Sequence, residues 1–319
     1  MSIGEFELIE RFFARPVRRA ALGVGDDCAL LAAGPGMQLA VSTDMLVEGR
    51  HFLSTVDAER LGHKALAVNL SDLAACGARP LAFTLALALP AADATFLERF
   101  ARGLFALADA HGCELVGGDT TRGPLTVCIT VFGEVPAGAA LLRSGAHVGD
   151  DVYASGTLGD ARLALEAFRG TLRLPGSQFD AVRAALETPQ PRVALGLALR
   201  GVASSAIDVS DGLLGDLGHL LQHSAVGACV EVDLVPRSTV LQAQPHAVQR
   251  TCTLAGGDDY ELLFTAPPSA RAAVHTAGRA AGVAVTRIGR IEAACGLRLV
   301  DAAGSTVAHD FRSFDHFRP

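Results

Sequence analysis

Apolar positions along the chain follow two spacings, one typical of strands and one typical of helices. Runs rich in apolar and β-branched residues predict strands at 37–43, 80–89, 114–117, 125–135, 151–155, 260–265 and 285–291. Helical periodicity predicts helices at 57–76, 93–111, 159–169, 192–200 and 269–281, with a strand leading into a helix at 205–222. Residues 171–191 show neither pattern, and we expect an irregular connection there.

The periodic pattern is interrupted once, around residues 136–150, where Pro, Gly, Ala and small polar residues predominate. A chain of 319 residues is long enough for two domains of ordinary size. We therefore predict an N-terminal domain over residues 1–137 and a C-terminal domain over residues 138–319. Strands and helices alternate in both halves, so the fold class is α/β (or α+β) with two domains.

Composition excludes several classes of protein. Hydrophobic residues make up 50% of the chain and charged residues 19%, which is typical of a globular protein. The longest uncharged apolar stretch, residues 80–92, is shorter than the roughly 18 residues of a membrane-spanning helix. The N-terminus carries acids where a secretory signal has bases, so we expect a cytoplasmic protein without membrane partners. A net charge of −7 without a Lys/Arg run argues against binding to nucleic acid. The seven cysteines are scattered and show no CxxC spacing, which indicates reduced thiols.

The acidic residues are notable for where they stand, because most follow a glycine turn or end a predicted strand. They are Asp26 and Asp27 in GVGDDCALL, Asp44 in AVSTD, Asp72 in NLSDLAACGA, Asp119 in ELVGGDTTRG, Asp208 and Asp211 in AIDVSDGLLGD, and Asp258 and Asp259 in LAGGDDYELLF. A single aspartate after glycine is usually a turn or a helix cap, and Ser210 or Asp211 would be a good N-cap for the following helix. Asp72 fits that explanation poorly, because a carboxylate on an apolar helix is costly unless it is paired.

Together these acids predict a site for metal ions and a polyphosphate. Converging carboxylates need cations to remain ionised, and few bases lie near them in the sequence. Mg²⁺ prefers such oxygen ligands and is often shared between one or two carboxylates and substrate phosphates. The chain has no P-loop, complete dinucleotide fingerprint, protein-kinase signature or GxSxG elbow. No cysteine has an obvious partner histidine, which favours direct transfer between bound substrates.

Six motifs resemble those of the thiamine-monophosphate kinase family, in the same order and at similar spacing. They are GVGDDCALL, STDMLVEGRHF, GHKALAVNLSDLAACGARP, VGGDTTRGP, AIDVSDGLLGDL and AGGDDYELLFT. The resemblance runs from about residue 4 to the C-terminal SFDHF. It implies a two-domain PurM-like fold whose N-terminal mixed sheet pairs in a homodimer. It also implies ATP-dependent phosphorylation of thiamine monophosphate to thiamine diphosphate with several Mg²⁺ ions, the final step of thiamine diphosphate biosynthesis.

The resemblance also assigns roles to individual residues. The metal ligands would be Asp27, Ser42, Thr43, Asp44, Asp72, Asp119, Asp208 and Asp211. The nucleotide contacts would be Gly118, Asp119, Arg143 and Ser210. The thiamine-phosphate contacts would be His51, Asp258 and Phe314. The residues acting on the transferred phosphoryl group would be Asp44, Asp72, Asp119 and Arg143. The family commonly has Glu where Asp258 stands, so the shorter side chain needs a water or a backbone shift to make that contact.

Two alternatives remain open at the level of the sequence. One is another ATP-using enzyme of the same superfamily, such as aminoimidazole ribonucleotide synthetase or selenophosphate synthetase. These should differ in the DMLVEG and GGDDYE segments, and the latter should carry a reactive N-terminal Cys or Sec, which is absent here. The other is a non-catalytic metal–nucleotide sensor that keeps the same motifs.

Overall fold

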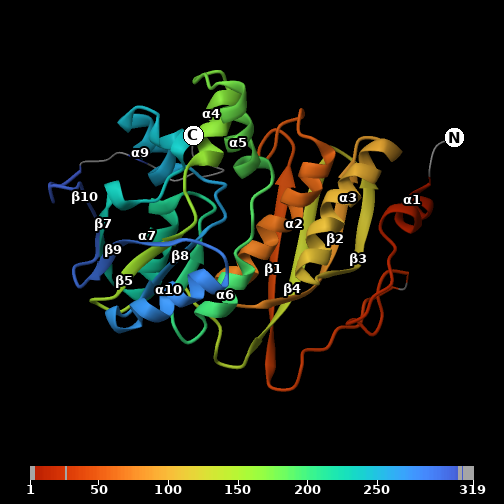
Figure 1. Ribbon diagram of the computed structural model, residues 1–319. Helices are drawn as coiled ribbons and strands as arrows, with labels where there is room; N and C mark the ends of the chain where they lie inside the picture. The colour runs from red at the N-terminus through yellow and green to blue at the C-terminus, as the bar shows by residue number, and fades with distance from the viewer. Residues whose placement is uncertain (1–3, 26, 308–310, 312–319) are drawn as a thin grey trace. The chain divides into compact units, whose positions relative to one another are not determined.

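The computed structural model describes residues 4–25, 27–307 and 311 (Figure 1). The described chain forms two compact units. The first contains the residues up to Leu73 together with Ala78–Gly138, and the second contains Ala74–Gly77 and the residues from Ala139 onward. Both units combine a sheet with helices, which confirms the predicted mixed α/β class. No helix in the described part of the chain is long and apolar enough to cross a membrane.

The N-terminal unit contains a four-stranded sheet with the order β1-β4-β2-β3. Its strands are β1 (Met37–Val47), β2 (Arg79–Leu89), β3 (Glu114–Arg122) and β4 (Thr126–Pro136). β4 pairs antiparallel with both β1 and β2, whereas β3 pairs parallel with β2. Because β2 and β3 are parallel, a crossover helix must connect them, and α3 (Ala94–His111) fills this role.

Two long helices of this unit, α2 (Ala58–Ala75) and α3, approach each other closely. Glycine permits this contact, since a Cβ at Gly62 would lie 2.0 Å from the carbonyl oxygen of Phe100. A Cβ at Gly103 would likewise lie 1.8 Å from the carbonyl oxygen of Glu59. A short helix, α1 (Glu5–Phe12), precedes the sheet. The close crossing fixes α2, which carries one of the predicted metal ligands.

The two faces of the N-terminal sheet differ in burial. Along β4, buried Val127, Ile129 and Val131 alternate with half-buried residues, as expected for a sheet that packs on one face only. On the other face of β1, three large apolar side chains are exposed. They are Leu39 at 45%, Val41 at 58% and Met45 at 55%. An apolar strip of this kind on a sheet face is unusual for a surface that stays in water.

The C-terminal unit contains a six-stranded sheet with the order β10-β7-β9-β5-β8-β6. Its strands are β5 (Asp151–Ser155), β6 (Ser205–Asp208), β7 (Gly227–Glu231), β8 (Leu262–Ala266), β9 (Val285–Glu292) and β10 (Gly296–Val300). The pair β10–β7 is parallel and the other neighbouring pairs are antiparallel. Every residue of β5 and β8, which lie inside the sheet, is buried, so these two strands are covered on both faces.

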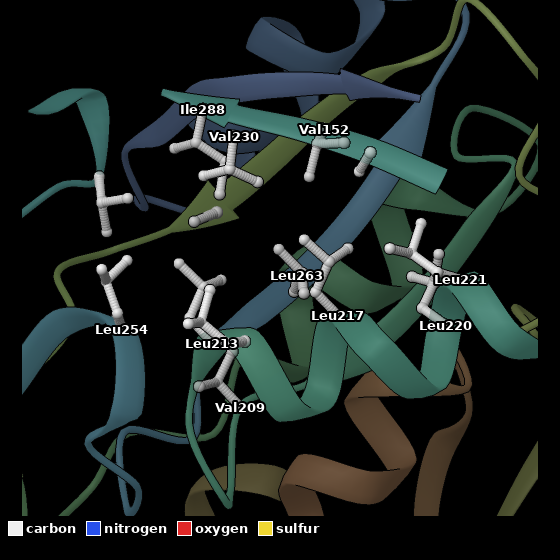
Figure 2. Close-up of a cluster of buried hydrophobic side chains, with 14 of the residues drawn as sticks. Val152, Val209, Leu213, Leu217, Leu220, Leu221, Val230, Leu254, Leu263 and Ile288 are labelled. Carbon is white, nitrogen blue, oxygen red and sulfur yellow. The ribbon is translucent and has the colours of Figure 1, made fainter. Parts of the chain in front are cut away.

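Helix α7 (Leu213–Ser224) forms much of the core on one face of this sheet (Figure 2). Its side chains Leu213, Leu217 and Leu220 are completely buried and pack in one cluster with Val230 and Ile288 of the strands. The remaining helices are α4 (Asp160–Phe168), α5 (Gly176–Glu187), α6 (Val193–Leu199), α8 (Thr239–Gln242), α9 (His246–Ala255) and α10 (Arg271–Ala280), with 3₁₀ turns at Val232–Leu234 and Pro268–Ala270.

The prediction of an irregular connection at 171–191 is wrong, because α5 occupies most of it. The helix is stabilised by packing against α4 rather than by a strong local pattern. Phe179 meets Phe168 edge to face with ring centroids 5.0 Å apart, and Val182 and Leu186 are buried in the same cluster. The elements β7, α8, α9 and β10 are also absent from the prediction, because such short segments gain their stability from neighbouring elements.

Candidate active site

The first group of predicted site residues lies where β1 meets α2. Ser42 donates a hydrogen bond from Oγ to Oδ2 of Asp72 over 2.5 Å. The backbone N–H of Asp44 donates to Oδ1 of Asn69 over 3.0 Å. Asn69 and Asp72 are three residues apart and therefore share one face of the helix. The structure thus brings Ser42, Asp44 and Asp72 together along one side of an edge strand.

This arrangement explains the presence of Asp72 on an apolar helix. Its neighbours Leu70 and Leu73 are buried, whereas Asp72 itself is half-buried. A carboxylate in that position needs hydrogen-bond donors to offset its desolvation. The hydroxyl of Ser42 is one such donor. Asp72 is therefore compatible with the fold before any ligand is considered.

Asp44 and Asp119 lie inside strands, so the prediction that they end strands is wrong. β1 continues to Val47 and β3 continues to Arg122. Asp44 is paired with Ile129 of β4, and Asp119 is paired with Ala86 of β2. Both strands extend past their acids because backbone pairing needs no apolar side chain where a position is accessible to water.

The two faces of the sheet separate the predicted metal ligands of this unit. Asp119 belongs to a row of paired residues that continues with Ala86, Cys128 and Met45. It therefore shares a face with Met45 and with Thr43, whose hydroxyl lies 2.8 Å from Oγ1 of Thr130. Asp44 alternates with these residues and points to the helix side of the sheet. The sheet thus brings Asp44 and Asp72 to one face and places Asp119 on the other.

Gly118, beside Asp119, occupies a position that requires glycine. Its φ is +154°, and a Cβ there would lie 1.9 Å from the carbonyl oxygen of Leu85. The register of β2 and β3 shifts just before this point, leaving one extra residue in β3. Such a bulge bends the strand and brings the two backbones close. The local fold accounts for Gly118, and its contact with a nucleotide stays a prediction.

Two further predicted residues of the N-terminal unit lie in loops. Asp27 is exposed in a bend closed by the isolated bridge between Leu22 and Leu30. His51 follows β1, and its Nδ1 accepts a hydrogen bond from the backbone N–H of Val47 over 2.9 Å. A neutral His51 therefore carries its proton on Nε2. That nitrogen is the atom of His51 suited to donate to a phosphate oxygen.

In the C-terminal unit, Asp208, Ser210 and Asp211 lie on the connection from β6 to α7. Asp208 is the last residue of β6 and is buried. The expected side-chain cap by Ser210 or Asp211 is not found, because Gly212 stands at the N-cap without a side-chain bond. Instead, Oδ2 of Asp216 accepts hydrogen bonds from the backbone N–H groups of residues 210, 211 and 212, each over 3.1 Å. Burial is the main cause, and the negative charge of Asp211 the second, of a pKa of Asp216 that is raised to about 7.

The segment 256–261 is joined to this connection by backbone hydrogen bonds. The N–H of Asp258 donates to the carbonyl oxygen of Ser210, and the N–H of Tyr260 donates to that of Val209, both over 2.8 Å. Asp258 and Tyr260 have φ values of +66° and +50°, which non-glycine residues seldom adopt. The hydroxyl of Tyr260 donates to Oδ1 of Asp258 over 3.1 Å. The structure therefore brings Asp258 close to Ser210.

Buried polar contacts also hold the segment 256–261 in place. Arg192 donates to both carboxylate oxygens of Glu261, with Nε 2.7 Å from Oε2. Ser155 donates to Glu261 over 2.5 Å and accepts the backbone N–H of Leu262 over 2.8 Å. The adjacent Asp259 accepts the N–H of Gly159, and burial raises its pKa well above the usual value. These contacts keep the backbone of residues 258 and 260 in its unfavourable conformation.

The last two predicted residues are less informative. Arg143 is exposed in the connection that precedes β5, and its carbonyl oxygen accepts a hydrogen bond from Oγ of Ser224 over 3.1 Å. An exposed guanidinium is well suited to a phosphate. Phe314 lies outside the described residues, so its predicted contact with thiamine phosphate stays a prediction.

Comparisons with known proteins assign the chain to a family. Residues 25–135 match the family AIR synthase related protein, N-terminal domain, and residues 147–302 match AIR synthase related protein, C-terminal domain. The thiamine-monophosphate kinase of Salmonella typhimurium (strain LT2) is 46% identical over 326 residues, which cover 99% of either chain. The chain belongs to the thiamine-monophosphate kinase family. The resemblance of the six motifs is thereby confirmed.

Solved structures of the thiamine-monophosphate kinase family share this fold. The crystal structure of the enzyme from Stenotrophomonas maltophilia K279a is 46% identical, with a TM-score of 0.87, and the match covers 96% of this chain and 99% of that one. AaThiL complexed with AMPPCP and TMP is 30% identical, with a TM-score of 0.78 and coverage of 90% and 89%. The predicted PurM-like fold with two domains is confirmed.

The oxygen atoms that the fold groups together are of the type that Mg²⁺ prefers as ligands. Within the described ranges, no three His, Cys, Asp or Glu side chains are gathered closely enough to hold a metal ion by themselves. The grouped donors Ser42, Asp44 and Asp72 are hydroxyl and carboxylate oxygens, which are the ligands of a hard cation. Mg²⁺ keeps several waters and is commonly bound by one or two carboxylates plus substrate phosphates. The donor set therefore suits an ion that arrives with a nucleotide.

Asp216, Arg192 and Glu261 organise the predicted contacts in the C-terminal unit but are not among the predicted site residues. Asp216 had a detectable signal, since it interrupts the apolar stripe formed by Leu213, Leu217 and Leu220. The same reasoning that distinguished Asp72 would have applied to it. The pairing of Arg192 with Glu261 left no such signal, because 69 residues separate them.

Proposed function

We propose that this protein transfers the γ-phosphoryl group of ATP to the phosphate of thiamine monophosphate, giving thiamine diphosphate and ADP. The observation that carries the proposal is the 46% identity, over 99% of the chain, to a thiamine-monophosphate kinase. A related structure that holds AMPPCP and TMP supports ATP as the co-substrate and thiamine monophosphate as the acceptor. The reaction is the final step of thiamine diphosphate biosynthesis.

The carboxylates of the N-terminal unit neutralise phosphate charge through Mg²⁺ in this proposal. Asp44 and Asp72 would be the principal ligands, with Ser42 and Asp27 as further oxygen donors. Thr43 and Asp119, which lie on the opposite face of the sheet, would hold a separate ion. In the C-terminal unit, Asp208 and Asp211 are ligands, and Ser210 contacts the nucleotide. Bound Mg²⁺ would supply positive charge that neutralises the phosphates in the transition state. Gly118 and Arg143 contact the nucleotide phosphates, and the guanidinium of Arg143 contributes positive charge.

The chain's own residues need not act as nucleophile or general base. The acceptor is a phosphate monoester with a second pKa of about 6, so its attacking oxygen is already largely deprotonated at neutral pH. Burial raises the pKa of the Cys113 and Cys252 thiols to about 12, which keeps both protonated and unreactive. Nδ1 of His51 already accepts a backbone hydrogen bond. These features support direct transfer governed by positioning and electrostatics.

Three residues bind thiamine monophosphate in this proposal: His51, Asp258 and Phe314. His51 donates from Nε2, and Asp258 offers a carboxylate whose direction is fixed by Tyr260 and by the backbone bond to Ser210. Asp258 is one methylene shorter than the glutamate common at this position. Either a water molecule or a shift of the backbone would complete its contact with the substrate.

A second copy of this chain covers the open face of the N-terminal sheet in this proposal. The strip formed by Leu39, Val41 and Met45 is apolar, lies on one strand and would otherwise remain in water. A twofold axis would place identical strips against each other, as in most homodimers. The enzyme works in the cytoplasm, where ATP is available and where its seven free cysteines remain reduced.

The proposal is tested by incubating the purified protein with ATP, Mg²⁺ and thiamine monophosphate and separating the products by chromatography. We expect thiamine diphosphate and ADP in equal amounts. Binding of ATP without turnover would identify a metal–nucleotide sensor. Turnover only with an aminoimidazole ribonucleotide precursor or with selenide would assign the protein to another branch of the superfamily. Both outcomes contradict the proposal.

Direct transfer is tested with ATP that is chirally labelled at the γ-phosphorus. A single in-line displacement inverts the configuration at phosphorus. Retention would reveal two successive displacements and therefore a phosphoenzyme. Exchange of label between ATP and ADP without thiamine monophosphate would also contradict direct transfer.

A further inference from the structure

One buried carboxylate controls the backbone of the connection between β6 and α7. Asp216 is 3% exposed, and a single oxygen of its side chain accepts three consecutive backbone N–H groups. Such a convergence fixes the planes of three peptide groups at once, because each bond constrains the direction of one N–H. The side chains of Ser210 and Asp211 project from these same peptide groups.

Asp216 is itself firmly held. It lies in the first turns of α7, and its own N–H donates to the carbonyl oxygen of Gly212 over 3.1 Å. Leu213 and Leu220, three and four residues away on the same side of the helix, are completely buried in the cluster of Figure 2. Helix α7 cannot shift without disturbing the core, so the position of the Asp216 carboxylate is fixed.

The backbone N–H groups of residues 210–212 have their acceptor in Asp216. The carbonyl oxygens of Val209 and Ser210 accept the N–H groups of Tyr260 and Asp258, but these bonds leave the N–H groups of 210–212 to Asp216. Gly212 is buried, and Ser210 and Asp211 are half-buried. Without the carboxylate, three sheltered donors would lose their acceptor, and the connection would rearrange to recover hydrogen bonds.

We propose that Asp216 is a positioning residue for nucleotide binding, which holds the backbone of 210–212 so that Ser210 and Asp211 face ATP and its metal. It acts through the backbone and touches no substrate. The inference rests on the proposed function, because the roles of Ser210 and Asp211 come from it. A residue that only capped α7 would affect folding and leave nucleotide affinity per folded molecule unchanged.

The test compares three variants of the full-length protein. Asp216→Ala removes the acceptor, Asp216→Asn keeps an acceptor oxygen of the same reach, and Asp150→Ala is a matched control. Asp150 is also buried in this unit and accepts the N–H of His147 over 3.0 Å and the hydroxyl of Ser204 over 2.6 Å. Two properties are measured: amide hydrogen exchange over residues 209–213 without metal or nucleotide, and the affinity for AMPPCP with Mg²⁺, corrected for the folded fraction.

We expect Asp216→Ala to lose exchange protection at 210–212 and to bind AMPPCP about tenfold more weakly, since three hydrogen bonds to one buried acceptor are lost. Asp216→Asn should stay within about threefold of wild type, and Asp150→Ala should bind normally despite any loss of stability. The inference is overturned if Asp216→Ala binds within about threefold of wild type, or if Asp216→Asn is impaired as severely. A wild-type protein that binds AMPPCP but makes no thiamine diphosphate would sink the proposed function and leave this inference intact.

Discussion

The two sheets of this protein carry their predicted site residues in different ways. The N-terminal sheet is covered by helices on one face, and its edge strand β1 itself bears Ser42, Thr43 and Asp44. The C-terminal sheet is buried on both faces through its central strands, and its site residues stand on the connections that leave the strands. Asp208 ends β6, and Ser210, Asp211 and Asp258 follow strands or precede them.

This difference has consequences for stability. A residue on a half-open sheet can be changed with little loss of packing, so its chemistry is separable from folding. A residue on a connection keeps its position only through buried partners, such as Asp216 for Ser210 and Glu261 with Arg192 for Asp258. Function and stability should therefore be uncoupled in the first unit and coupled in the second.

The largest effect should come from Asp44→Asn in the N-terminal sheet. We expect kcat/KM to fall roughly 10³-fold, equivalent to about 4 kcal/mol, because a metal ligand for the phosphates is lost. The free energy of unfolding should stay the same or rise slightly, since one negative charge is removed from an acidic group. Steady-state kinetics at saturating Mg²⁺ and urea denaturation measure the two quantities.

The control for this variant is Asp109→Asn, which removes an exposed carboxylate paired with Arg15 elsewhere in the same unit. It should leave kcat/KM unchanged. Near-normal turnover of Asp44→Asn would remove Asp44 from the metal site. A large loss of stability would contradict the uncoupling of function from folding in this unit.

The next largest effect should come from Arg192→Leu in the C-terminal unit. Its partner Glu261 is 6% exposed, and removing one member of a buried ion pair leaves the other charge without compensation. We expect the free energy of unfolding to fall by about 3 kcal/mol and the KM for thiamine monophosphate to rise, because the 258–261 segment loses its support. Urea denaturation and steady-state kinetics provide the measurements.

Arg169→Leu serves as the control, since Arg169 is exposed and its partner Glu166 keeps a second ion pair with Arg162. It should cost no more than about 0.5 kcal/mol. If Arg192→Leu also cost that little, the buried pair would not support the segment. An unchanged KM for thiamine monophosphate would contradict the expected coupling between stability and function in this unit.

A smaller effect should follow from Val41→Lys on the open face of the N-terminal sheet. We expect the dimer to dissociate at least about tenfold more readily, because a desolvated charge would face its symmetry-related copy. Unfolding of the monomer should change by less than about 0.5 kcal/mol, since Val41 is mostly exposed. Sedimentation equilibrium gives the dissociation constant.

Val148→Lys provides the comparison, because Val148 is an equally exposed valine of the C-terminal unit. It should leave the oligomeric state unchanged. A monomeric wild-type protein, or equal effects of the two variants, would show that the apolar strip on β1 is not an interface between copies.

The smallest effect concerns the pH dependence of the C-terminal unit. The hydrogen bond from Arg271 holds the pKa of Asp151 below its usual value. A carboxylate whose pKa is lower in the folded protein contributes stability above its unfolded pKa, and that contribution is lost as the pH falls through the folded pKa. Asp151→Asn should therefore flatten the loss of stability below about pH 4. Urea denaturation at a series of acidic pH values gives the slope, and an unchanged slope would contradict the assignment.

Much of the fold followed from local pattern. The strands at 80–89, 125–135 and 151–155 and the helices at 57–76 and 93–111 are found within two residues of their predicted ends. These segments carry enough apolar periodicity to specify their own conformation. The helix α5 could not be predicted in this way, because its stability depends on Phe168 and other partners in α4. Its local sequence alone gives a weak signal.

Residue identity and order were enough to establish the family and to predict a site for metal ions and a polyphosphate. Six motifs with their aspartates, and no nucleophile signature, are properties of the chain as written. Which of these acids lie close together depends on how the strands and helices pack in three dimensions. Strand register put Asp44 and Asp119 on opposite faces of one sheet. Asp216 became the acceptor for the peptide groups of Ser210 and Asp211 because helix α7 is packed where its carboxylate reaches them. Such contacts depend on distances in space, which hydrophobic periodicity does not encode.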